Sequence, residues 1–333
     1  MEFLTDYGLF LAKFITVVII FALIAGGILI MIFRAKADGE GHFNITNLNQ
    51  KYENMNLFLQ SQILPKNEFK KLIKETKSKH KKKDKESKSE HDRRKIYVID
   101  FKGDIKATDV LSLREKITAI LTVAESEDEI VVLLESAGGT VHGYGLCASQ
   151  LKRIRDKNIK LTVSVDKVAA SGGYMMACVA NKIIAAPFAI IGSVGVLAQI
   201  PNFNRLLKKH SIDFEQITAG EHKRTLTLFG ENTDKDREKM KEELEETHQL
   251  FKEFIKANRN QVDIEKVATG EHWYGKKAIE LMLVDELITS DDYLSSAAQS
   301  ADLYQIDYIR KKPISEKLFS IGARLLDHLD RSA

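Results

Sequence analysis

The pattern of apolar and polar positions changes period repeatedly in the part of the chain that follows residue 95. Short runs rich in Val and Ile, typical of strands, alternate with longer segments in which apolar residues recur every three to four positions, as in helices. This alternation predicts an α/β fold with right-handed crossovers and a mostly parallel sheet that helices cover on both faces. The expected strands are residues 96–101, 130–135, 161–165 and a run near 212–218, and the expected helices are 110–123, 143–156, one ending at 180, 234–258 and 275–282.

The longest apolar run, residues 14–33, contains twenty residues and no charge. A helix of this length spans about 30 Å, which matches the hydrocarbon core of a bilayer. A cleaved signal peptide is the alternative, since residues 35–37 read Ala-Lys-Ala, but its apolar part is about 7–15 residues long, and Glu2 and Asp6 contradict its basic start. We therefore expect one uncleaved transmembrane helix after an N-terminal flank of residues 1–13. The few basic residues beside it leave open which side of the membrane carries the rest of the chain.

A second apolar run, residues 183–200, is interrupted by Pro187, two glycines, Ser193 and Gln199. These residues break a helix more than a membrane span comfortably allows. We therefore expect two short buried strands joined by a turn in this run, and no second span.

Residues 34–95 are hydrophilic and poor in aromatic side chains, so we expect a lysine-rich linker that buries nothing, with a frayed amphipathic helix over 48–73 up to Pro65. Fourteen Lys/Arg and six Asp/Glu between residues 66 and 95 give a local charge of +8. This stretch is either a polybasic segment held near anionic lipid headgroups or a solvated spacer. The whole chain carries +3, so the rest sums to 3 − 8 = −5, and no general basic surface for nucleic acid is expected.

Two glycine-rich turns follow two of the expected strands and carry the candidate chemistry. Residues 135–141 read Glu-Ser-Ala-Gly-Gly-Thr-Val, and paired glycines at the end of a parallel strand let backbone N–H groups approach a ligand and hold an oxyanion. Residues 166–174 place Ser171 between Ala and Gly at the start of a helix, where its hydroxyl is exposed beside free N–H groups. Each turn alone also fits plain close packing, but two such turns in one sheet favour an acyl-transfer site.

A nucleophilic serine needs a base, and the sequence offers His142, His222 and Lys223. Histidine titrates near neutral pH, whereas a lysine acts as a base only when burial lowers its pKa to about 7–8. From the residues alone, His142 and Lys223 stay equal alternatives. Cys147 and Cys178 fit neither a disulfide framework nor a metal site and are expected to be small buried hydrophobes. No dinucleotide or phosphate-loop motif is present, so we expect no cofactor.

Five motifs in a fixed order resemble the signal-peptide-peptidase SppA (protease IV) family. The resemblance spans residues 96–290, and one peptidase unit after one anchor and a lysine-rich linker is similar to the single-unit inner-membrane peptidases of that family. The motifs are Ser136-Ala-Gly-Gly-Thr-Val, Val168-Ala-Ala-Ser-Gly-Gly-Tyr, Gly192-Ser-Val-Gly-Val, Ala219-Gly-Glu-His-Lys and Gly270-x-x-Trp-x-Gly-x-x-Ala, the last followed by Val284-Asp285.

The resemblance implies a ClpP/crotonase-like fold and a serine–lysine dyad that needs neither metal nor nucleotide. Ser171 falls on the family's nucleophile and Lys223 on its general base. Gly139 and Gly172 fall on its oxyanion-hole positions. Ala137 departs from the proline that the family usually has there, which can loosen the substrate-binding turn but removes no N–H group.

The expected organisation is therefore a peptidase domain over residues 96–295 and a tail over 296–333 with an amphipathic helix at 314–329. The resemblance implies a homo-oligomeric serine endopeptidase in the bacterial inner membrane that acts on signal peptides or misfolded membrane-protein segments. Two rival classes are a membrane scaffold with a silent site and a crotonase-type acyl-CoA enzyme, which shares the fold but not the Ser/Lys motifs.

Overall fold

The computed structural model describes residues 13–16, 18–21, 26, 41–85, 93–220 and 223–310. The chain divides into two compact units, residues 1–44 with 308–333 and residues 45–307. Most of the predicted span 14–33 and all of the predicted tail helix 314–329 lie outside the described residues. Within the described part of the chain, no helix is both long and apolar enough to cross a bilayer.

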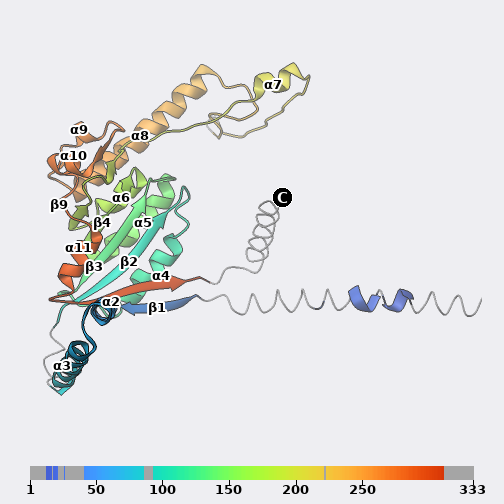
Figure 1. The fold of residues 1–333 in the computed structure, drawn as a ribbon. Coiled ribbons are helices and arrows are strands. Elements are labelled where there is room, and N and C mark those ends of the chain that lie inside the picture. Colours follow the sequence, from blue (N-terminus) through green and yellow to red (C-terminus); the bar gives the residue numbers. More distant parts are fainter. Residues whose placement is uncertain are drawn as a thin grey trace, which may run out of the picture. The chain divides into compact units, whose positions relative to one another are not determined.

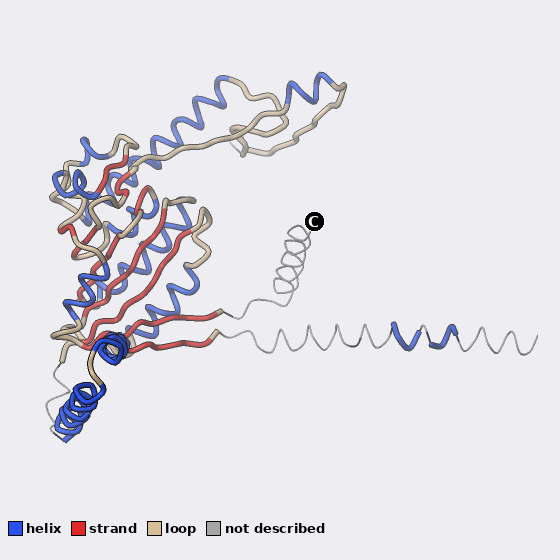
Figure 2. Tube along the Cα trace, viewed as in Figure 1, coloured by secondary structure: helices blue, strands red, loops and turns tan. Residues whose placement is uncertain are grey.

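A mostly parallel sheet organises the larger unit (Figures 1 and 2), which confirms the α/β prediction. Strands β10, β2, β3, β4, β6 and β9 lie side by side in this order, and each neighbouring pair is parallel. Strand β5 pairs in parallel with β3 and β7, and β7 pairs antiparallel with β8. The bounds are β1 His42–Asn47, β2 Lys95–Gly103, β3 Glu129–Ser136, β4 Lys160–Val165, β5 Val168–Ala170, β6 Lys182–Ala185, β7 Ile190–Gly192, β8 His272–Tyr274, β9 Glu286–Leu287 and β10 Asp302–Ile309.

The helices follow the predicted pattern closely. The predicted helix 234–258 has both bounds right, because Thr233 and Asp236 form a reciprocal capping box at its start. The bounds are α2 Leu48–Ile63, α3 Lys66–Lys85, α4 Val110–Ile120, α5 Val141–Asp156, α6 Gly172–Ala177, α7 Asn204–Lys209, α8 Asp234–Asn258, α9 Ile264–Val267, α10 Gly275–Glu280 and α11 Ser290–Ala297.

Helices cover both faces of the sheet, as the sequence predicts. Successive strand residues point to opposite faces. In β2, Ile99 and Phe101 belong to the main core, which also contains residues of α4, α5 and α6. Ile96 and Val98 belong to a smaller cluster on the other face, with Leu48 of α2 and residues of α11. The near-continuous apolar runs of the central strands follow from this burial on two sides.

The second apolar run forms two buried strands, as predicted. It supplies β6 and β7, which are joined by a turn around Pro187, and Ile183 and Ile191 are fully buried in the main core. Cys147 and Cys178 are also buried and unpaired, as expected. Burial raises the pKa of both thiols to about 12, so they remain protonated and unreactive near neutral pH.

The prediction that residues 34–95 bury nothing is wrong. Strand β1 and helices α2 and α3 lie in this stretch, and Leu48 is only 4% exposed. The Asn49 side chain donates to the carbonyls of Ala298 and Ala301 and accepts from the N–H of Leu303. The average hydropathy of residues 34–95 is low, so it did not indicate the few residues that attach the first turn of α2 to the domain.

Two further expectations differ from the structure. No strand forms at residues 212–218, because every residue there is exposed and none of the strands that the structure describes pairs with this run. In the other direction, the predicted tail contributes a strand of the main sheet, since β10 pairs in parallel with β2.

Candidate active site

The two glycine-rich turns lie against each other at the carboxyl ends of neighbouring strands. Strands β3 and β5 are parallel and pair Ser136 with Ala169, so the turns that follow them begin at the same edge. A Cβ atom on Gly138 would lie 2.7 Å from the backbone nitrogen of Gly172 and 2.8 Å from Cβ of Ser171. The convergence expected from the sequence is therefore present, and only a glycine at position 138 permits this approach.

Ser171 occupies a strained turn between β5 and α6. Its backbone angles are φ 52° and ψ −120°, a conformation that non-glycine residues rarely adopt. Its N–H donates to the Gly192 carbonyl at 2.7 Å, and its own carbonyl accepts from the Met175 N–H at 2.9 Å. A serine held on a sharp strand-to-helix turn presents its hydroxyl outward as a nucleophile. The side chain is half-buried, as such a role requires.

Backbone N–H groups lie next to this serine. Gly172 is the first residue of α6, so its N–H has no acceptor within the helix. Gly138, at φ 91°, turns the chain so that Gly139 follows directly against the loop after β2. The Ile105 carbonyl oxygen accepts from the N–H of Thr140 at 2.8 Å. A Cβ on Gly139 would lie only 2.1 Å from the same oxygen, so the chain passes this close only with a glycine there. The turn is thus fixed from one side by residue 105 and from the other by α6.

A pair of buried hydroxyl groups supports the turn from below. The hydroxyl oxygens of Ser136 and Tyr144 are 2.5 Å apart, and the Tyr144 hydroxyl donates to the Asp104 carbonyl at 2.8 Å. The Ser136 oxygen also accepts from the N–H of Gly138 at 3.1 Å. The Tyr144 ring packs under α6, since a Cβ on Gly172 would lie 2.4 Å from its Cγ. Burial raises the pKa of Tyr144, so this hydroxyl stays a donor.

This hydroxyl pair was not predicted from the sequence. Ser136 lies in one of the quoted motifs, but Tyr144 is on α5, and its partners come from the end of β3 and from the loop after β2. A tyrosine on the buried face of a helix usually signals only packing. No local pattern therefore identifies it.

Lys223 lies in a different part of the unit. It is exposed and lines a pocket of about 830 Å³ whose walls come from residues 200–229. Among the described residues, no hydrogen bond links its side chain to Ser171, and its N–H donates to the Gly220 carbonyl at 3.2 Å. Of the two histidines considered as a base, His142 is exposed in the first turn of α5 and His222 lies outside the described residues.

The segment that carries Lys223 has no core of its own. None of the described residues from 195 to 240 is buried. Its aromatic residues contact one another, with ring centroids 6.0 Å apart for Phe203 and Phe229 and 5.7 Å apart for Phe214 and Phe229. In Figure 1 this segment, including α7, projects beyond the sheet. The first buried residue of α8 is Phe251.

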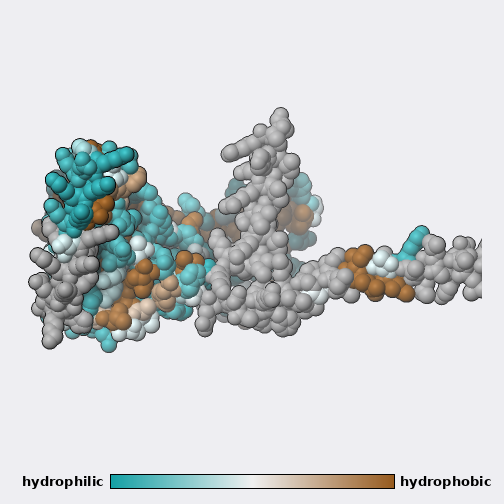
Figure 3. All heavy atoms as spheres, turned by 60° about the horizontal axis from the view of Figure 1, so that its bottom comes forward, coloured by the Kyte–Doolittle hydropathy of each residue, from teal (hydrophilic) through white to brown (hydrophobic). Residues whose placement is uncertain are grey.

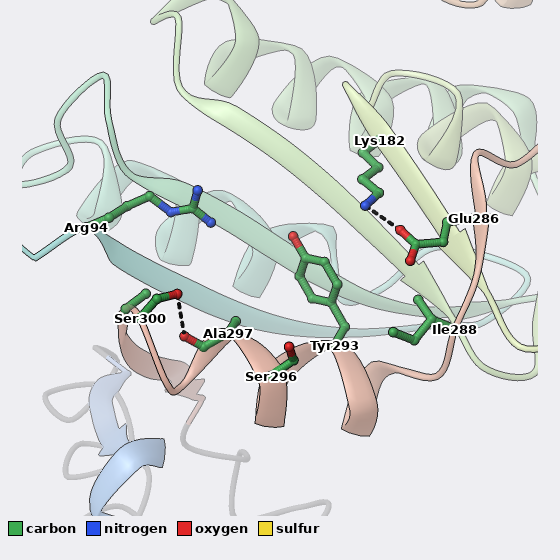
Figure 4. Close-up of a pocket in the computed structure, with 9 residues that line it drawn as sticks. Arg94, Lys182, Glu286, Ile288, Tyr293, Ser296, Ala297 and Ser300 are labelled. Atoms are coloured by element: carbon green, nitrogen blue, oxygen red, sulfur yellow. Dashed lines mark hydrogen bonds and ion pairs between the residues drawn. The ribbon is translucent and has the colours of Figure 1, made fainter.

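A second cavity, of about 380 Å³, lies at the opposite end of the strands, where β2, β6 and β9 begin (Figure 4). Lys182 and Glu286 point toward each other across it at 2.5 Å, and Tyr293 projects from α11 between them and Arg94. Arg94 pairs with Glu129. The charges of this cavity are therefore satisfied within the fold, which indicates a structural role.

Glu129 is fully buried and is the centre of that ion cluster. Burial alone would raise its pKa, but hydrogen bonds from Thr162 and Tyr293 and the charges of Lys160 and Arg94 outweigh this, so the pKa of the carboxyl is lowered. The carboxylate is stable inside the protein for this reason. No group of His, Cys, Asp and Glu in the described chain is arranged as a metal site.

Comparison with known proteins identifies the family. The sequence profile of the N-terminal part of peptidase family S49 matches residues 2–151, and that of peptidase family S49 matches residues 153–304. The chain is 49% identical over 326 residues to the "Probable protease SohB" of Haemophilus influenzae, covering 95% of this chain and 92% of that protein. It is 52% identical over 320 residues to the protein of the same name from Buchnera aphidicola subsp. Acyrthosiphon pisum, covering 95% and 93%.

A solved structure is also similar. It is a mutant of the membrane-bound stomatin-specific protease 1510-N, with a TM-score of 0.41 and 15% identity over 62% of this chain and 84% of that one. The two family profiles and the curated relatives cover nearly the whole chain. The chain therefore belongs to peptidase family S49, a family of serine proteases.

Proposed function

We propose that the chain is a membrane-anchored serine endopeptidase with a ClpP/crotonase-like fold in which Ser171 is the nucleophile and Lys223 the general base. The strained backbone of Ser171 carries this proposal, because φ 52° at a strand-to-helix turn costs free energy and serves to expose a hydroxyl. In the acylation step, Ser171 Oγ attacks a peptide carbonyl carbon while neutral Lys223 Nζ takes the hydroxyl proton. The resulting lysinium then protonates the leaving amine, and water hydrolyses the acyl-enzyme.

The oxyanion of the tetrahedral intermediate is held by the N–H groups of Gly139 and Gly172. One such donor is worth about 3 kcal/mol in known oxyanion holes. The close approach of Gly138 to the Gly172 nitrogen and to Ser171 supports this proposal, because Gly139 directly follows Gly138 in the same turn. An extended peptide binds along the edge beside this turn. The substrates we propose are signal peptides or misfolded segments of membrane proteins, cleaved at the bacterial inner membrane.

The dyad forms between neighbouring copies in a homo-oligomer. Lys223 is exposed in a segment without a core, and its pocket contains no residue of the Ser171 turn. A lysine acts as a base only where burial disfavours its charged form, and a neighbouring subunit would supply that cover. Mixing inactive Ser171→Ala with inactive Lys223→Ala should therefore restore part of the activity. Failure in verified mixed oligomers would place the dyad within a single chain.

A fluorophosphonate probe, which reacts with activated serines, tests the proposal directly. The full-length chain in detergent should be labelled, and Ser171→Ala should abolish labelling. Ser193→Ala is a matched control, because Ser193 also has a positive φ of 51° but follows β7 instead of starting a helix. A folded chain that takes no label would favour the alternative, a silent scaffold of the same fold.

A further inference from the structure

Helix α2 carries an apolar stripe that faces no other part of the described chain. Residues that recur every three to four positions on a helix form one stripe, and in a globular protein such a stripe normally faces a core. Here it is exposed to solvent. Its members, with their exposed fractions, are Met55 at 55%, Phe58 at 66%, Leu59 at 57% and Ile63 at 75%.

This stripe is a fixed feature of the surface, because the first turn of α2 is attached to the domain. Leu48 is buried in the smaller core cluster, and the Asn49 side chain makes three hydrogen bonds to residues 298, 301 and 303, of 3.0, 2.9 and 2.7 Å. Ile45 extends the apolar surface from β1 and is 63% exposed. A groove of about 570 Å³ runs between Ile45, Met55 and Phe58.

The next helix, α3, adds positive charge. Its twenty residues contain ten lysines, two glutamates and one aspartate, a net charge of 10 − 3 = +7. Lys66, Lys70 and Lys74 recur every four residues and are exposed. Only Leu64 and Pro65 lie between α2 and α3, so the basic helix begins directly after the apolar one. The face that carries them comes forward in Figure 3, where brown apolar and teal hydrophilic surfaces lie next to each other.

An exposed apolar stripe beside a dense run of lysines matches the surface of an anionic bilayer. Lysines bind the headgroup phosphates, while large apolar side chains enter the boundary between headgroups and acyl chains. We propose that α2 and α3 form a membrane-docking surface, in which the lysines of α3 bind anionic lipid headgroups and the α2 stripe inserts into the interface. The proposed anchor at 14–33 would favour this docking, since the fourteen residues from 34 to 47 span at most about 50 Å.

Docking would change which substrates the peptidase domain contacts first. A domain that is only tethered samples the solution around its anchor, whereas a docked domain stays at the level of the headgroups. Substrates that leave the bilayer would then reach the site before they are diluted. The proposal itself depends only on α2 and α3, and it survives if the function proposed above is wrong.

The test uses the full-length chain in vesicles of phosphatidylcholine, with or without phosphatidylglycerol. Phe58→Cys provides a labelling position for an environment-sensitive fluorophore, because the two native cysteines are buried. Leu250→Cys is a matched control, since Leu250 is 66% exposed on α8, like Phe58 on α2. Ile19→Cys reports separately whether the 14–33 run lies in the bilayer. Spin-labelled lipid in the vesicles quenches any fluorophore that reaches the interface.

We expect severalfold stronger quenching at position 58 in the anionic vesicles than in the neutral ones, and no such difference at position 250. Salt at about 1 M, where the Debye length is about 3 Å, should remove the difference. Changing four exposed lysines of α3 to Gln should weaken docking by nearly three orders of magnitude, because each lysine near an anionic surface contributes about fivefold. These four are Lys66, Lys70, Lys71 and Lys74.

A second four-lysine variant controls for the loss of net charge. It changes exposed lysines outside α3 to Gln and should dock like the unaltered chain. These lysines are Lys152, Lys157, Lys209 and Lys256. Equal weakening by both variants would overturn the proposal.

Two further results would also overturn it. One is an unquenched label at position 58 in anionic vesicles while position 19 is quenched, because the chain is then anchored but not docked. The other is a label at position 58 that is already shielded from iodide without vesicles, which would mean that a second copy or another segment of this chain covers the stripe. Loss of activity without loss of quenching would concern the proposed function and leave the docking surface standing.

Discussion

The Tyr144 hydroxyl gives a direct test of how the turn beside Ser171 is held in place. Tyr144→Phe removes this hydroxyl but keeps the ring that packs under Gly172. The buried Ser136 hydroxyl loses its acceptor, and Ser136 is 1% exposed, so water does not replace it. The Asp104 carbonyl loses one donor but still accepts from the N–H of Ala107 at 3.0 Å. The change therefore isolates the polar part of the support from the packing part.

The expected cost follows from the Ser136 contact. A buried polar group left without its partner costs about 1–3 kcal/mol, so we expect the free energy of unfolding to fall by about 2 kcal/mol. For a unit of this size that lowers Tm by about 4–8 °C. The Gly138 N–H depends on the orientation of Ser136, so the turn should also loosen. Complete loss of one oxyanion donor costs about 10²–10³ in rate, and a loosened turn should slow fluorophosphonate labelling about tenfold.

Tyr174→Phe is the matched control for this experiment. Tyr174 is also fully buried, and its hydroxyl donates to the Leu283 carbonyl at 3.0 Å, away from the turn. It should lose about 1 kcal/mol of stability and keep its labelling rate. Labelling rates are measured well below either Tm. If Tyr144→Phe is destabilised but labels at the unaltered rate, the hydroxyl pair supports the fold and does not position the turn.

Three further changes test other parts of the argument. Gly138→Ala should abolish fluorophosphonate labelling, because position 138 has φ 91° and the new Cβ would meet Gly172. Gly145→Ala on α5, where a Cβ has open space, should label normally in the same assay. The pKa of Glu129 is lower in the folded state than in the unfolded state, where it is about 4.3. The ionised carboxylate therefore stabilises the fold above that pH, and this stabilisation is lost as the pH falls toward the folded pKa. Glu129→Gln should flatten the decline of Tm below about pH 5, and an unchanged decline would contradict this. Lys223→Arg should be as inactive in peptide hydrolysis as Lys223→Ala, since arginine keeps its proton, and His142→Ala should stay active; the reverse result would make His142 the base.

The sheet and most helices could be predicted because their signals are local. Central strands that are buried on both faces have near-continuous apolar sequences. The start of α8 is marked by the capping box of Thr233 and Asp236. The strand expected near 212–218 failed because a β-rich run forms a strand only beside another strand. Leu48 was missed for the opposite reason, since a single buried residue in a hydrophilic stretch does not change its average.

The site divides in the same way. The meeting of the turns at 138 and 171 could be predicted, because parallel strands deliver their carboxyl ends to one edge of a sheet. The support under those turns could not, because it joins Asp104, Ser136 and Tyr144 through contacts that exist only after a loop, a strand and a helix have packed. Backbone strain at Ser171 was likewise invisible in the sequence, although the small residues on both sides permit it.

The uncovered segment around Lys223 has a physical consequence for activity. Phe203, Phe214 and Phe229 are each more than two-fifths exposed, which is unfavourable for aromatic side chains in water. The same segment holds the candidate base, which must lose contact with water in order to act. A single event, the covering of this segment by another copy, would satisfy both requirements. Assembly would then switch the peptidase on, because a lone chain holds a positioned serine but a solvated lysine.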